Sequence, residues 1–73
     1  MTKRYSLIHI YSTDPYIARV VRQGRRQGMI DEAKELAQTL REDGNSHNWR
    51  VVVDDSRTGK EVLRITAEHR VRP

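Results

Sequence analysis

IDEAKELAQTLRE, residues Ile30 to Glu42, is the stretch of this 73-residue chain whose pattern specifies one structure most clearly. Its apolar residues recur at spacings of three and four, which places them along one side of an α-helix. They are Ile30, Ala33, Leu36, Ala37 and Leu40. Gly28 precedes the segment, and Gly44 follows it where a left-handed residue can close the last turn. So short a helix is not stable alone in water, so its apolar side must pack on the rest of the chain, with Leu40 buried.

Three other segments have the composition of strands. Residues 4–12, RYSLIHIYS, are rich in β-branched and aromatic residues, but both faces of this strand carry apolar side chains. Periodicity therefore does not decide which face lies inside. Residues 49–54 contain three consecutive valines, which is typical of a central strand covered on both faces. Residues 60–71 alternate between apolar and polar side chains, which predicts a half-buried strand. Gly59 suits a hairpin turn before it.

Residues 15–23 can be interpreted in two ways. Asp14 followed by Pro15 matches the cap and the first position of a helix, which predicts a helix that ends at Gly24 or Gly28. The alternative is a hairpin turn at Asp14 and Pro15 followed by a strand, YIARVVRQ, which its β-branched content favours. The specific cap favours the helix.

The expected architecture is a single α+β domain, residues 1–73, with the order strand, helix, helix, strand, strand. Both helices would pack on one face of a three-stranded sheet, which lets each amphipathic element bury its apolar side. We expect the covered face to bear Ile8, Ile10, Leu63 and Ile65. The alternative order is ββαββ.

The composition argues against several classes of function. There is no cysteine and no apolar run long enough to span a membrane, so a cytoplasmic protein without a membrane partner is expected. The histidines, His9, His47 and His69, do not supply a metal-ligand set, and no cofactor is implied. No serine or threonine has a recognisable base partner. We therefore expect a binding protein rather than an enzyme.

Arginines provide the first candidate site. The net charge is +4, and residues 1–28 hold six bases against one acid. A basic surface attracts polyanions. The densest cluster is Arg19, Arg22, Arg25 and Arg26; on a helix, three of these would share one face and form a ridge that binds phosphates. This predicts a nucleic-acid-binding module, with a solvated basic face as the alternative.

The uncovered face of the sheet provides the second candidate site. It would present aromatic and basic side chains, which suit RNA binding or a homodimer interface, although they can equally form an ordinary surface. They are Tyr5, His9, Tyr11, Arg50, Arg64 and Arg70. The alternative function is therefore a protein-interaction module, an adaptor, inhibitor or regulatory subunit, that can form a homodimer through the sheet.

Overall fold

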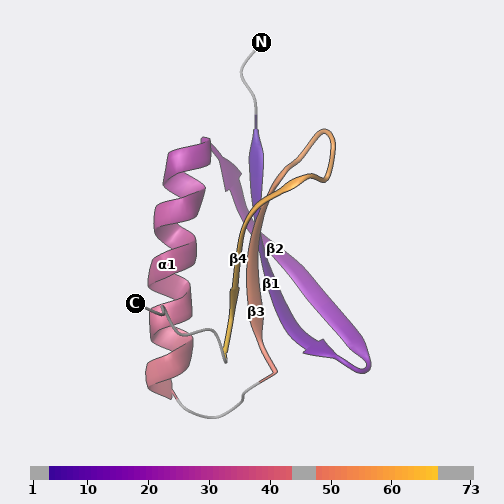
Figure 1. Cartoon of the computed structure of the whole chain (residues 1–73), viewed down its shortest axis with the longest axis vertical. Coiled ribbons are helices and arrows are strands. Elements are labelled where there is room, and N and C mark those ends of the chain that lie inside the picture. The colour runs from indigo at the N-terminus through magenta and orange to yellow at the C-terminus, as the bar shows by residue number, and fades with distance from the viewer. Residues whose placement is uncertain (1–3, 44–47, 68–73) are drawn as a thin grey trace.

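The computed structural model describes residues 4–43 and 48–67, apart from the side chain of Thr13. One helix packs on one face of a four-stranded antiparallel sheet with the strand order β2-β1-β3-β4 (Figure 1). The α+β class is confirmed, whereas the three-stranded sheet and the second helix are wrong. The elements are β1 (Tyr5–Thr13), β2 (Tyr16–Gly24), α1 (Arg26–Asp43), β3 (Arg50–Asp55) and β4 (Glu61–Thr66).

The segment predicted as the first helix is strand β2, so the alternative order ββαββ is the observed one. Asp14 and Pro15 form the turn between β1 and β2, and the peptide bond between them is cis. The β-branched residues of this segment fit the pleated surface of a strand better than a helix. Pairing with β1 also satisfies the backbone groups of β2 that point toward β1. Gly24 ends the strand, where a Cβ atom would lie 3.3 Å from Cε of Met29.

Helix α1 is where the sequence predicts it but starts four residues earlier. The backbone N–H of Met29 donates to the carbonyl of Arg25 at 2.9 Å, which closes the first turn. Gly28 therefore lies inside the helix rather than before it. The buried Met29 side chain adds one position at the start of the predicted apolar stripe, and Leu40 packs against the core but is only half-buried.

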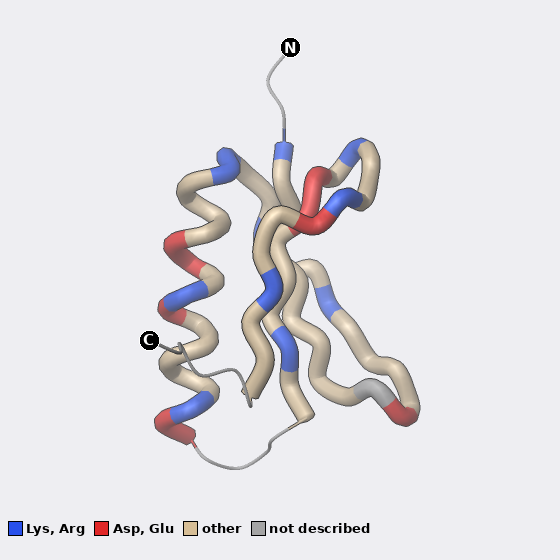
Figure 2. The backbone as a smooth tube through the Cα atoms, in the orientation of Figure 1, with Lys and Arg blue, Asp and Glu red and all other residues tan. Residues whose placement is uncertain are grey.

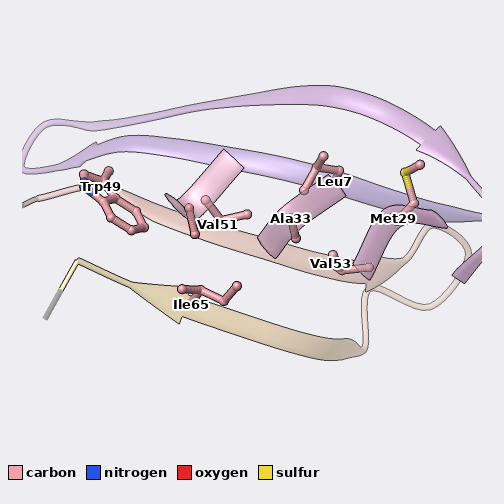
Figure 3. Packing of buried hydrophobic residues seen from close by; sticks show 8 residues of the cluster. Leu7, Met29, Ala33, Trp49, Val51, Val53 and Ile65 are labelled. Carbon is pink, nitrogen blue, oxygen red and sulfur yellow. The ribbon is translucent and has the colours of Figure 1, made fainter. Parts of the chain in front are cut away.

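The core lies between α1 and the sheet, as Figure 3 shows. The central strand β3 contributes two fully buried valines to it, and Val52 on the opposite face is also buried, so the prediction of a central strand covered on both faces is confirmed. Two alanines of α1 let the helix approach the sheet closely. The buried cluster comprises Leu7, Met29, Ala33, Ala37, Trp49, Val51, Val53 and Ile65.

The face of β1 that packs against the helix is the opposite of the predicted one. Leu7 pairs with Val53 and His9 pairs with Val51, so these β1 residues lie on the helix side of the sheet. Ile8 and Ile10 lie on the side that no helix of the described residues covers. The placement of Leu63 and Ile65 beneath the helix is confirmed by their contact with the core.

The β3–β4 connection is the expected hairpin turn. Gly59 has a φ of +77°, and its N–H donates to the carbonyl of Asp55 at 2.7 Å. The Asp55 carboxylate also accepts from the N–H of Arg57 at 2.8 Å, so this side chain folds the turn. Strand β4 ends at Thr66; residues 68–71 of the predicted strand lie outside the described residues.

Candidate protein-interaction surface

Strand β2 is an edge strand that is exposed along most of its length. In the sheet it pairs with β1 on one side, and no strand of the described residues pairs with its other side. Within the described ranges, the exposed large apolar side chains all belong to the β1–β2 hairpin. Their exposed fractions are 45% for Tyr11, 66% for Tyr16, 51% for Ile17, 52% for Val20 and 46% for Val21.

A register shift decides which way the side chains of β2 point. Ile8 pairs with Val20 and Leu7 pairs with Arg22, so Val21 is an extra residue in β2. Since His9 pairs with Arg19, both arginines lie on the helix side of the sheet although they are three residues apart. Val20 lies on the opposite side.

The predicted arginine cluster is not a ridge on a helix. Arg19 and Arg22 belong to β2, Arg25 lies between the strand and the helix, and Arg26 is the first residue of α1. Figure 2 shows Lys and Arg positions in blue on the β1–β2 hairpin and at the start of the helix. Arg22 forms an ion pair with Glu32 of α1 at 3.2 Å. Within residues 4–43 and 48–67, the other three have no carboxylate within ion-pair distance.

The aromatic side chains predicted for the open face of the sheet lie on its helix side instead. Tyr5 packs against the core, and His9 is only 8% exposed. The rings of His9 and Tyr11 stack with their centroids 3.9 Å apart, so Tyr11 lies on the same side. Burial lowers the pKa of His9, which favours its neutral form. These three residues therefore cannot stack RNA bases on the open face, because β1 presents its other face there.

Arg50 and Arg64 occupy the open face as predicted, and each has a polar partner within the protein. Arg64 Nε donates to Glu61 Oε2 at 3.0 Å, and its Nη2 also contacts Glu61 Oε1. This pairing raises the pKa of Arg64, and the proximity of Tyr16 contributes weakly in the same direction. Arg50 donates to the carbonyl of Asn48 at 3.5 Å. Arg70 lies outside the described residues.

A hydrogen-bonded group that sequence reasoning missed fixes one end of β2. Gln23 Nε2 donates to Ser6 Oγ at 3.1 Å, and Ser6 Oγ shares a hydrogen bond with Ser56 Oγ at 2.6 Å. Strand β2 is thereby tied through β1 to the β3–β4 turn. The hairpin diverges from α1 toward its turn (Figure 1), where Tyr11, Tyr16 and Ile17 are exposed.

The sequence signal for this surface was the apolar content of residues 16–21. It identified a strand in the alternative interpretation, but exposure could not be predicted without knowing that β2 is at the edge. Among the described residues, no three metal-ligating side chains come together, and His47 and His69 lie outside them. No helix in the described ranges has the length and hydrophobicity needed to cross a membrane. Comparisons with family models, curated proteins and solved structures give no match.

Proposed function

We propose that this protein is a protein-interaction module that binds its partner by adding a strand to the free edge of β2. The observation that supports this function is the position of the exposed apolar side chains. Four of the five lie on the edge strand and the fifth lies on its neighbour. An exposed apolar edge strand is a template for pairing with another chain.

The edge has the dimensions that strand addition needs. Strand β2 has nine residues, which corresponds to about 30 Å at the usual rise per residue. Main-chain hydrogen bonds to an added strand would provide affinity, and contacts with alternate side chains would provide specificity. The remaining large apolar side chains of residues 4–43 and 48–67 are buried or half-buried, so no second apolar surface competes with β2.

Site-specific photo-crosslinking tests this function. A photoreactive phenylalanine replaces Val20 in one protein and Glu35, an exposed residue of α1, in a control protein. After irradiation in native cells, we expect a discrete protein adduct from position 20 and none from position 35. Equal adducts from both positions, or none from position 20, would contradict strand addition at β2.

Nucleic-acid binding is the second candidate function, and it is favoured by basic side chains of β2 and of the start of α1 that form no ion pair among the described residues. Arg19, Arg25 and Arg26 are exposed and have no acidic partner among the described residues. Backbone phosphates are the ligands for such side chains, and the binding would weaken steeply with salt. Fluorescence anisotropy of labelled RNA and DNA at low salt tests it, with Arg25→Gln/Arg26→Gln as the variant. No binding at about 50 μM protein, where non-specific binders are detected, would exclude it.

A further inference from the structure

We infer that the strand which adds to β2 alternates acidic and apolar residues, with its carboxylates beside Arg19 and Arg22 and its apolar side chains beside Tyr16 and Val20. This inference rests on the proposed function and specifies the chemistry of the partner. It follows from the two faces of β2, which differ in charge.

One face of β2 carries two arginines because of the register shift at Val21. The shift places Arg19 and Arg22 opposite His9 and Leu7, two positions that share the helix side of the sheet. A regular strand would have put residues 19 and 22 on opposite faces. An added strand would therefore meet both guanidinium groups on the same face.

Both arginines remain able to bind a further carboxylate. No acidic group of the described residues is within ion-pair distance of Arg19. Arg22 contacts Glu32, yet its side chain stays 65% exposed. In an antiparallel pair, the Cβ atoms of directly opposite residues lie about 5 Å apart, close enough for acidic side chains of an added strand to reach these groups.

The other face of β2 is apolar. Val20 pairs with Ile8, and the alternation of the strand places Tyr16 on the same side. Tyr16 is 66% exposed and Val20 is 52% exposed. An added strand with an apolar residue at every second position would cover both side chains. The exposed Ile17 shares the face of Arg19, so the alternation is expected of the partner residues beside Arg19, Val20 and Arg22.

The charge pattern disfavours a second copy of this chain as the partner. Two β2 strands paired antiparallel about a two-fold axis would place Arg19 and Arg22 of both copies on one face of the joined sheet. Like charges opposite each other on neighbouring strands are destabilising. A partner strand with carboxylates at those positions removes this repulsion, so we expect the isolated protein to be a monomer.

Three fluorescein-labelled nine-residue peptides test the inference by anisotropy. In all of them valine alternates with a second residue, which is glutamate, lysine or serine. We expect the glutamate peptide to bind the parent protein about tenfold more tightly than the lysine peptide, since two opposite-charge pairs replace two like-charge pairs. Arg19→Glu should bring the two affinities close to parity. Arg57→Glu makes the same charge change in the β3–β4 turn and should keep the preference of the parent.

The outcomes separate the inference from the proposed function. If the three peptides bind equally and Val20→Pro abolishes their binding, the acidic preference is wrong but strand addition at β2 is supported. If no peptide binds at about 100 μM, above the range of an ordinary specific complex, both fall. Sedimentation tests for a dimer. If the protein dimerises and Val20→Lys makes it monomeric, the partner of β2 is a second copy of this chain rather than an acidic strand. If Arg57→Glu abolishes the preference for the glutamate peptide as fully as Arg19→Glu does, the preference depends only on the net charge of the protein.

Discussion

Replacing Leu7 and, separately, its neighbour Ile8 with alanine tests which face of β1 builds the core. Leu7 is 1% exposed between the sheet and α1, so Leu7→Ala should lower the free energy of unfolding by about 2–5 kcal/mol. Ile8 is half-buried on the other side of the sheet. Ile8→Ala should therefore lower the free energy of unfolding by about 1 kcal/mol, half of the usual burial energy of such a side chain. For 73 residues the whole free energy of unfolding is expected to be about 4–11 kcal/mol, so the first loss is severe.

Urea denaturation measures both losses. Trp49, the single tryptophan, is buried in the same core and reports unfolding by its fluorescence. With an m-value of about 1 kcal/mol/M, the midpoint should fall by at least 2 M in Leu7→Ala and by about 1 M in Ile8→Ala. Circular dichroism in the absence of urea checks that each variant is folded. A larger loss for Ile8→Ala than for Leu7→Ala would refute the observed face of β1 and restore the one predicted from sequence.

Three further perturbations have definite expected signs. Gly59 has a φ of +77°, so Gly59→Ala should lower the free energy of unfolding in urea by about 1–2 kcal/mol, and Gly59→Asn by less. The pKa of Asp54 is raised first by burial and then by the charges of Glu61 and Asp55, so the ionised carboxylate destabilises the fold. Asp54→Asn should therefore raise the melting temperature at pH 7, and the gain should shrink as the pH falls and Asp54 becomes protonated. Burial lowers the pKa of His9 below its ordinary value of 6.5, so the neutral form is stable in the fold and stability is lost as the pH falls below 6.5. His9→Gln should flatten this loss in melts between pH 7 and pH 5, and an unchanged slope would assign it to other groups.

The helix could be predicted because its signals are local. Its apolar residues lie within one segment, and their spacing alone identifies the side that packs on the sheet. The sequence places its start at Ile30 because Gly28 resembles a boundary residue. A glycine costs a helix only about 1 kcal/mol, which burial of Met29 in the first turns offsets.

Local patterns could not predict that residues 16–24 form strand β2, or which face of β1 packs on the helix, because both depend on pairing with residues distant in sequence. Asp14 and Pro15 fit a helix start as well as a hairpin turn, and pairing with β1 selects the turn although the cap pattern favours the helix. Leu7 and Ile8 are comparably apolar, and the register with Val53 selects the one that faces α1.

The candidate site was predicted in composition but not in geometry. The spacing predicts one shared helix face for Arg19, Arg22 and Arg26, and only Arg19 and Arg22 share a face in the fold. They share it through a register shift in a strand rather than through the period of a helix. Such a shift has no signature in residues 19–22, and the exposure of Val20 depends on the position of β2 at the sheet edge.

The position of β1 in the middle of the sheet affects how the chain can fold during its synthesis. The ribosome completes the β1–β2 hairpin before it makes α1 and β3, and an isolated hairpin is at best marginally stable in water. Leu7 acquires its neighbour Val53 of β3 only when the last third of the chain is made, although Ala33 of α1 is made earlier. Until then the apolar side of the hairpin stays accessible to chaperones and proteases, so nascent chains stalled before β3 should be digested far faster than the released protein.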